Sequence, residues 1–284
     1  MSNNRVYKAE VYSKINLSLE ITGKSENLHT LKMLVCPYKE YKDIVTFYPS
    51  DVNQTDISIE VVEAYSDKSS SQSNEVAEVP FDKVRFTDFF IPKAKAIAKK
   101  LGVSGKLEII KGVPLGAGLG GSTASIVGAL KAMSEYAQDI QKSAALDDGF
   151  LISLGSDVPS MLYGKPCVVS GVGEVVKPVK LPFDAECFKV EIASGGSDTG
   201  ACYRRYDELV AEGADTSRDL NGIDCASEIT IDGERIELYK NALTMPACLL
   251  NENIQKLING LRKKSDCVFL SGSGSAVVYK NNKS

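Results

Sequence analysis

The chain of 284 residues is long enough for one large or two medium-sized domains, since a single hydrophobic core seldom grows beyond about 250 to 300 residues. Hydrophobic residues make up 43% and charged residues 25%, which is typical of a globular protein and excludes a disordered or fibrous chain. The net charge of −4 gives no overall positive field for a nucleic acid backbone, so we expect no nucleic acid partner.

A single histidine, His29, excludes metal sites that need two imidazoles and leaves at most one serine–histidine–aspartate arrangement. Catalysis then has to rest on Asp, Lys, Ser or backbone amides. Seven widely spaced cysteines without a C-x-x-C pair favour buried reduced thiols. Neither the N-terminus nor any later stretch approaches the ~18 apolar residues of a membrane span, so we expect a cytoplasmic protein without a membrane partner.

The first predicted element is a strand over residues 11–21, where apolar and polar side chains alternate. Lys14 and Asn16 lie on its polar face, and the plain interpretation of that face is that solvent covers it. After a polar turn, which ends at His29, a second apolar run over residues 31–38 predicts a further strand.

The middle of the chain predicts a loop, a helix and a strand. Residues 66–78 are Ser-rich and have no periodicity, which indicates a surface loop. Helical spacing of apolar residues over 91–102 predicts a helix that ends at Gly102, followed by a strand over 106–112. A second amphipathic helix begins near Ser122.

Beyond Gly164 the sequence changes to short strands, which places a domain boundary there and divides the chain into residues 1–164 and 165–284. The acidic stretch 208–237 is expected to be weakly structured. A helical region over 236–264, interrupted or restarted at Pro246, precedes a final strand, glycine turn and strand.

A glycine-rich loop joins the strand at 106–112 to the helix near Ser122. Backbone N–H groups there can approach a phosphate closely, and the helix dipole adds roughly +0.5 charge. The glycines also match G-x-G-x-x-G, but their context argues against a dinucleotide-binding fold, and a helix entry without a ligand remains open. The loop comprises Pro114, Leu115, Gly116, Ala117, Gly118, Leu119, Gly120, Gly121, Ser122 and Thr123.

Asp157 lies in the segment L-G-S-D-V-P, just before another short helix. Its plain interpretation is a helix cap, with Pro159 in the first helical turn. A catalytic role is compatible with that position.

Taken in order, these segments resemble the GHMP kinase superfamily. The matching segments are Y-S-K-I-N-L-S-L at 12–19, His29-Thr30, the glycine loop, L-G-S-D-V-P-S-M-L-Y-G at 154–164, G-V-G-E at 171–174 and S-G-S-G-S-A-V-V-Y at 271–279.

The resemblance implies an α+β fold with a ribosomal-protein-S5-like N-terminal domain that binds ATP and a ferredoxin-like C-terminal domain. It implies ATP bound by the glycine loop, with Mg²⁺ neutralising the phosphates. Asp157 would correspond to the catalytic base and Lys14 to the lysine that keeps this base ionised. The implied assembly is a monomer or homodimer.

Within the superfamily, the opening strand and the His-Thr turn resemble the members that phosphorylate a cytidine-diphosphate ester of methylerythritol in the non-mevalonate isoprenoid pathway. His29 would then bind the cytosine, and Asn16 would line the substrate site. Leu28 occupies the position of the family's usual stacking ring, so we expect either a lower affinity for cytidine or another aromatic, such as Tyr38, in its place. A different small alcohol, such as a sugar, homoserine or a mevalonate-like compound, is the alternative acceptor, and a nucleotide-binding module without catalysis is the non-enzymatic one.

Overall fold

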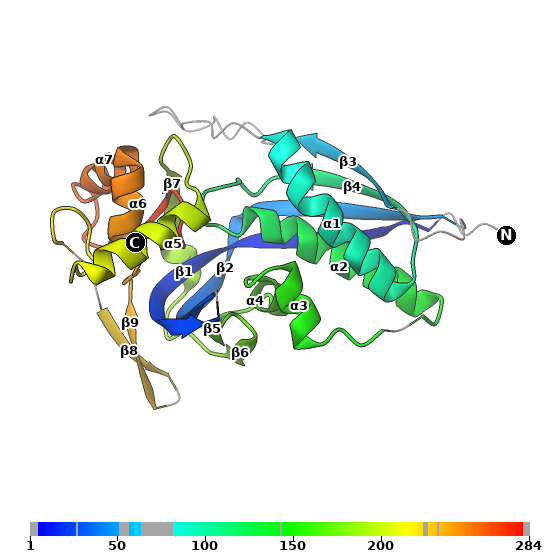
Figure 1. Cartoon of the computed structure of the whole chain (residues 1–284), viewed down its shortest axis with the longest axis horizontal. Helices are drawn as coiled ribbons and strands as arrows, with labels where there is room; N and C mark the ends of the chain where they lie inside the picture. The colour runs from blue at the N-terminus through cyan, green and yellow to red at the C-terminus, as the bar shows by residue number, and fades with distance from the viewer. Residues whose placement is uncertain are drawn as a thin grey trace.

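The computed structural model describes residues 5–26, 28–50, 57–63, 82–142, 144–223, 227–231 and 233–280. The segment 66–78, predicted as a surface loop, lies outside these ranges. Figure 1 shows the described elements in two groups, a long sheet with its helices at the right and a smaller sheet with its helices at the left. This mixture of helices and sheets confirms the predicted α+β class.

The first group is built on a mixed sheet of six strands in the described residues, in the order β3-β4-β2-β5-β6, with β1 paired to the other edge of β2. Only β3 and β4 run parallel among these pairs, which is unlike the parallel sheet of a dinucleotide-binding fold. The strands are β1 (Tyr7–Ser25), β2 (Leu28–Pro49), β3 (Ile57–Glu63), β4 (Gly105–Lys111), β5 (Cys167–Gly171) and β6 (Val175–Pro178).

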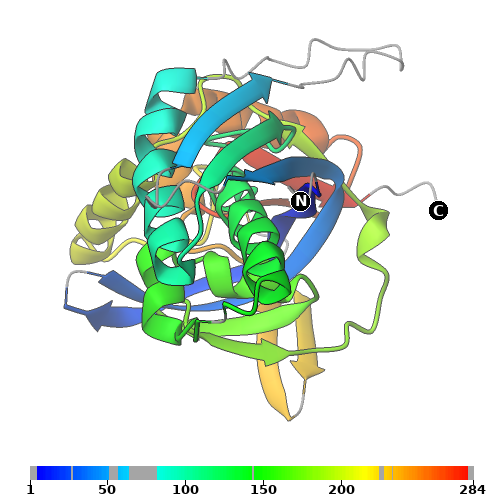
Figure 2. The same ribbon diagram turned by 90° about the vertical axis from the view of Figure 1, so that its right-hand side faces the viewer.

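Two long helices, α1 (Lys83–Leu101) and α2 (Gly121–Asp139), lie over one face of this sheet, as Figures 1 and 2 show from two directions. The predicted end of α1 is confirmed, because Gly102 caps it in the left-handed conformation. The helix begins earlier than expected, since the side chain of Asp82 accepts a hydrogen bond from the N–H of Arg85 and caps it. The predicted start of α2 is confirmed to within one residue.

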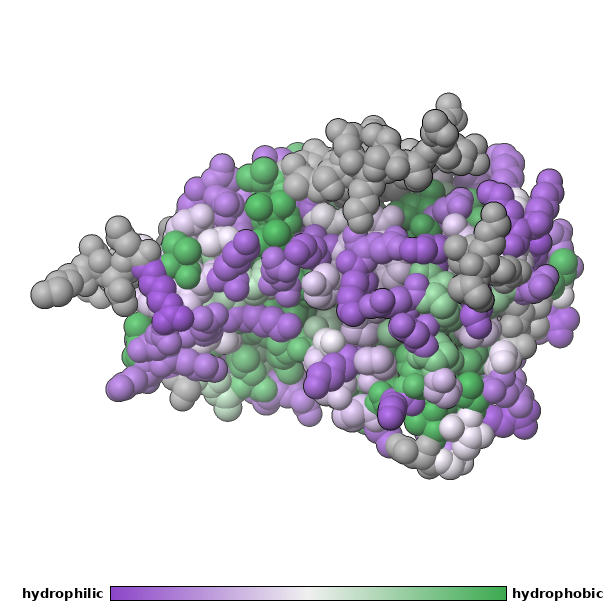
Figure 3. Space-filling view, turned by 180° about the vertical axis from the view of Figure 1, so that it is seen from behind, coloured by the Kyte–Doolittle hydropathy of each residue, from purple (hydrophilic) through white to green (hydrophobic). Residues whose placement is uncertain are grey.

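The second group contains an antiparallel sheet in the order β10-β11-β7 and a projecting two-stranded hairpin, β8–β9. Seen from behind, hydrophilic residues cover much of the molecule, and apolar residues gather at the lower right (Figure 3). The strands are β7 (Phe188–Ile192), β8 (Ser227–Ile231), β9 (Glu234–Leu238), β10 (Val268–Leu270) and β11 (Ala276–Lys280). The helices are α5 (Thr199–Ala211), α6 (Thr244–Leu250) and α7 (Glu252–Leu261), and two shorter ones, α3 (Asp148–Leu154) and α4 (Val158–Tyr163), precede this group.

None of the helices in the described ranges is both long enough and apolar enough to cross a membrane. Four of the six cysteines in the described ranges are buried. β5 and β6 follow the boundary predicted at residue 164 but extend the first sheet, and the division itself stays a prediction.

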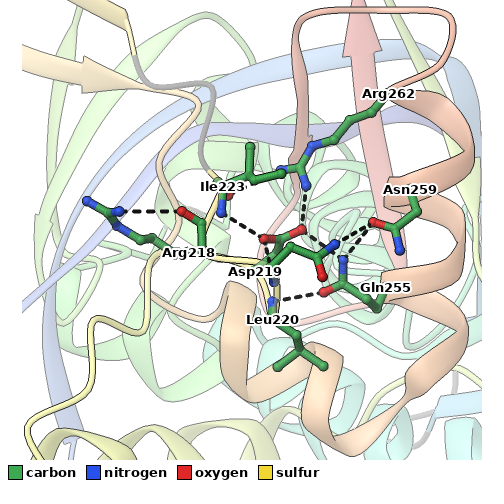
Figure 4. Close-up of polar contacts among 9 residues, drawn as sticks. Arg218, Asp219, Leu220, Ile223, Gln255, Asn259 and Arg262 are labelled. Atoms are coloured by element: carbon green, nitrogen blue, oxygen red, sulfur yellow. Dashed lines mark hydrogen bonds and ion pairs between the residues drawn. The ribbon is translucent and has the colours of Figure 1, made fainter.

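The prediction of a weakly structured stretch over 208–237 is wrong, because a buried carboxylate orders its loop. Asp219 is 1% exposed and accepts hydrogen bonds from the side chains of Gln255 and Arg262 on the α7 side and from the N–H of Ile223 (Figure 4). Burial alone would raise the pKa of Asp219, but these bonds outweigh it and hold the pKa below its usual value. The stretch also includes the end of α5 and most of the β8–β9 hairpin.

The prediction that β1 has one buried face is also wrong, because β1 and β2 are covered on both sides. Ile15 and Leu17 pack into the core beneath α2, whereas Leu19 and Met33 pack into a second core that includes residues of α5, α6 and α7. A β-bulge between Asn16 and Ser18 shifts the register of β1 against β2 at the point where these two cores meet.

One buried ion pair joins β2, β4 and α2. Lys111 at the end of β4 and Asp43 in β2 are fully buried, with Nζ 2.7 Å from Oδ2. The same carboxylate accepts hydrogen bonds from the backbone of Gly112 and from the hydroxyl of Ser125, and Lys111 also donates to the carbonyl of Gly121. Burial lowers the pKa of the Lys111 ammonium, and the charge of Asp43 opposes this shift.

We predict that Asp43→Ala lowers the free energy of unfolding by about 3–5 kcal/mol, because it leaves the Lys111 ammonium buried without its counter-charge. Urea denaturation measures this loss. Glu10→Gln is the matched control, since Glu10 pairs with Lys42 at the surface of the same sheet and such pairs contribute about 0–1 kcal/mol. Equal losses in the two variants would contradict the prediction.

Candidate active site

The glycine loop carries a backbone that favours glycine. Gly116, Gly118 and Gly120 have φ values of +67°, +83° and +76°, which side chains rarely tolerate. A Cβ on Gly121 would lie 2.2 Å from the carbonyl oxygen of Pro114. Because α2 starts at Gly121 without a side-chain cap, its first N–H groups have no acceptor within the helix. This arrangement fits an anion such as a phosphate.

The ten residues predicted for this site all lie in the loop or in the first turn of α2. Ser122 and Thr123 are partly buried, which leaves their hydroxyl groups within reach of a ligand. The Thr123 hydroxyl lies 4.0 Å from the position of a Cβ on Gly155, so the helix start and the turn before Asp157 are neighbours.

A second glycine turn, Ser271–Ser275 between β10 and β11, supports the loop from the side. The hydroxyl of Ser271 donates to the carbonyl of Gly118 and accepts a hydrogen bond from the N–H of Asn16. A Cβ on Gly274 would lie 1.9 Å from the carbonyl carbon of Ala117, so the two backbones touch directly. The loop is therefore fixed against β1 and β11 while its helix end stays open.

Lys14 and Asp157 meet beside this loop. Lys14 Nζ lies 3.4 Å from Asp157 Oδ2 and donates a hydrogen bond of 2.6 Å to Asn16 Oδ1. Lys14 and Asn16 are 5% and 1% exposed, so the prediction that solvent covers them is wrong. The Asp157 side chain is 26% exposed, which leaves the carboxylate accessible to a small molecule.

The cap interpretation of Asp157 is half right. Asp157 is the residue before α4, and proline lies in the first turn, but its side chain makes no capping hydrogen bond and contacts Lys14 instead. Its position depends on the turn at 171–174, since a Cβ on Gly173 would lie 2.2 Å from the carbonyl oxygen of Ser156. The carboxylate is therefore held by packing and remains available for chemistry.

His29 lies in an aromatic and acidic setting at the start of β2. Its Nε2 is 2.8 Å from Asp207 Oδ1, the ring of Tyr203 stacks on it with centroids 4.8 Å apart, and Tyr206 meets it edge-on. The side chain is only 13% exposed. Burial, and then the negative charge of Asp157, raise the pKa of the Tyr203 hydroxyl.

The aromatic residue suggested to replace the family's stacking ring was wrong. Tyr38 is 4% exposed and belongs to the core beneath α1 and α2, whereas Leu28 is 55% exposed. Tyr203 supplies a ring beside His29 instead. The spacing of Tyr203, Tyr206 and Asp207 at i, i+3 and i+4, which places them on one face of a helix, was the signal that could have found them.

Comparisons with known proteins show which kinases the chain is similar to. Residues 89–165 match the model of the GHMP kinases N terminal domain. The chain is 26% identical over 273 residues to 4-diphosphocytidyl-2-C-methyl-D-erythritol kinase, chloroplastic/chromoplastic, of Solanum lycopersicum, which covers 93% of this chain and 62% of that protein. It is 25% identical over 276 residues to 4-diphosphocytidyl-2-C-methyl-D-erythritol kinase of Paramagnetospirillum magneticum. This match covers 95% of this chain and 87% of that protein. The chain is therefore similar to GHMP kinases, over residues 89–165 by the family model and over most of its length by these two relatives.

The solved structure of a 4-(cytidine 5'-diphospho)-2C-methyl-D-erythritol kinase has a TM-score of 0.58 and 22% identity, and the match covers 97% of this chain and 90% of that one. This likeness confirms the predicted two-domain GHMP kinase fold. The chain spans less than two thirds of the length of the tomato relative.

We predict that Gly118→Ala destabilises the protein more than Gly213→Ala does. Both glycines have φ near +80°, so both variants carry the cost of a left-handed alanine, about 1–2 kcal/mol. At Gly118 the new Cβ would also lie 2.1 Å from the carbonyl oxygen of Ser271 and separate the two glycine turns, whereas Gly213 has open space around it. Urea unfolding of both variants measures the difference; equal midpoints would count against the packing of the two turns.

Proposed function

We propose that this protein is an ATP-dependent kinase that phosphorylates a hydroxyl group of 4-diphosphocytidyl-2-C-methyl-D-erythritol, as the names of its relatives describe. The observation that carries the proposal is the Lys14–Asp157 pair beside an anion-binding glycine loop. The stacking of Tyr203 on the ring of His29 supports a nucleotide-bearing acceptor rather than a simple alcohol.

In this proposal Asp157 accepts the proton of the acceptor hydroxyl while that oxygen attacks the terminal phosphorus of ATP, the bond from this phosphorus to the bridging oxygen breaks, and ADP leaves. Lys14 offsets the charge that develops on the transferred group and, with Asn16, fixes the side of Asp157 from which the hydroxyl approaches. Phosphoryl transfer demands positioning and charge stabilisation more than covalent chemistry, and these parts supply both.

The phosphates of ATP would lie on the N–H groups at the start of α2, with the hydroxyls of Ser122 and Thr123 as further donors. We propose that Mg²⁺ arrives with ATP and offsets the phosphate charge. The described residues hold no group of three His, Cys, Asp or Glu side chains that could bind a metal, and Mg²⁺ in such sites is held mainly by phosphates, water and one or two protein oxygens. The hydroxyl of Ser122, in the first turn of α2, is the candidate for such a protein oxygen.

We further propose a cytoplasmic location, a monomer or homodimer, and a division of the chain near Gly164. The N-terminal part would then carry the ATP site, together with Lys14 and Asp157. The C-terminal part would close the acceptor site through α5.

We predict that Asp157→Asn lowers kcat by about 10²- to 10⁴-fold while the affinity for ATP stays unchanged, because the amide cannot accept the proton. ADP release measured with 4-diphosphocytidyl-2-C-methyl-D-erythritol tests this. Asp148→Asn is the control, since Asp148 is exposed in the first turn of α3. Unchanged turnover in Asp157→Asn excludes its role as the base, and turnover of only other alcohols by the unaltered protein overturns the substrate assignment.

We predict that Gly173→Ala lowers kcat at least about tenfold without changing the KM for ATP, because it displaces the turn that carries Asp157, and small displacements at a reacting centre are costly. Gly213→Ala is the matched control, with a positive φ but open surroundings. A raised KM for ATP with normal kcat would show that Gly173 supports the nucleotide site instead.

A further inference from the structure

The hydrogen-bonding state of His29 is set by its neighbours. Nε2 lies 2.8 Å from Oδ1 of Asp207, and Nζ of Lys24 donates a hydrogen bond of 2.8 Å to Oδ2 of the same carboxylate. Burial would raise the pKa of Asp207, but the hydrogen bonds from Lys24 and His29 outweigh it and keep the pKa below its usual value. The carboxylate is therefore an acceptor, and Nε2 has to carry the proton.

The other ring nitrogen is then defined as well. A neutral imidazole carries one proton, so a proton on Nε2 leaves Nδ1 with a lone pair that accepts hydrogen bonds. Within the described residues Nδ1 has no hydrogen-bond partner in the protein. Tyr203 covers one face of the ring and Tyr206 meets its edge, which restricts the approach of a ligand.

We propose that Asp207 is a specificity-determining positioning residue, which rests on the proposed function. By accepting the Nε2 proton it keeps Nδ1 of His29 as an acceptor, and this selects an acceptor molecule whose base presents an amino group at that edge. Cytosine presents its exocyclic amino group as a donor, whereas uracil presents a carbonyl oxygen there, which would face the lone pair of Nδ1 without a proton between them.

The expected preference for cytosine over uracil can be estimated from the cost of leaving polar groups without hydrogen bonds. Replacing a donor by an acceptor leaves two acceptors facing each other in a largely buried site, which costs about 10- to 100-fold in affinity. Asp207 lies on α5 and Lys24 near the end of β1, so the two parts of the molecule together fix the state of one ring.

The tautomer can be read directly, because this chain has a single imidazole and its nitrogen signals need no assignment by mutagenesis. In a two-bond proton–nitrogen correlation spectrum of the labelled full chain at a pH where the ring is neutral, we expect the proton on Nε2 only. Asp207→Ala should give signals averaged between the two tautomers. Glu208→Ala, which removes the next acid on the same helix and its exposed pair with Arg205, should leave the spectrum unchanged.

Calorimetry with CDP and UDP measures the specificity. We expect the unaltered protein and Glu208→Ala to prefer CDP by about 10- to 100-fold and Asp207→Ala to bind both with similar affinity. Asp207→Asn keeps the size of the side chain but can donate as well as accept, so its preference should lie in between, and this variant replaces the alanine if the latter does not fold.

The inference is overturned if the unaltered protein carries the proton on Nδ1, if it binds CDP and UDP alike or binds neither, or if Asp207→Ala keeps the full preference. These outcomes are separate from failure of the proposed function. A protein that discriminates CDP from UDP through Asp207 but does not phosphorylate the cytidine substrate supports the inference and refutes the proposed reaction. A protein that phosphorylates the cytidine substrate but does not discriminate CDP from UDP supports the proposed reaction and refutes the inference.

Discussion

The site depends above all on the buried ion pair between Asp43 and Lys111. A loop with four glycines has little stiffness of its own, so its shape must come from what surrounds it. The carboxylate holds the N–H groups of Gly112 and Val113 at the start of the loop, and the ammonium holds the carbonyl of Gly121 at its end. A charge pair that is free of solvent fixes both ends while leaving the helix N–H groups open to a ligand. A side-chain cap on α2 would have occupied them.

The loop and the helix that follows it could be predicted from sequence because they depend on neighbouring residues. Glycine is needed wherever φ is positive, and the apolar stripe of α2 is visible over a few turns. The burial of Lys14 and Asn16 could not be predicted in this way. It arises because residues 239–242 bond to the free edge of β1 and because α5, α6 and α7 contribute to a core on its second face, far along the chain.

The surroundings of His29, the proposed acceptor side of the site, were the least predictable part for the same reason. His29 was found from a local motif, but its partners Tyr203 and Asp207 lie on a helix of the second group, and helical periodicity alone does not say which strand a helix face will meet. The prediction for the loop before the β8–β9 hairpin was wrong for a different reason. Its acidic composition indicated a solvated chain, yet one of its carboxylates, Asp219, is buried against α7 by specific donors.

The second core therefore has two roles that are hard to separate. It covers the face of β1 and β2 beside Lys14 and Asn16, and it also seats α5, because Cys202 is fully buried in that core while the next residue, Tyr203, stacks on His29. A shift of α5 would then move the Tyr203 ring that stacks on His29. It would also disturb the core that covers the sheet face beside Lys14. In the proposed reaction, His29, which would bind the acceptor, and Asp157, which would take its proton, are positioned by one packing interface, so an acceptor that fits poorly at His29 would also be poorly placed for Asp157.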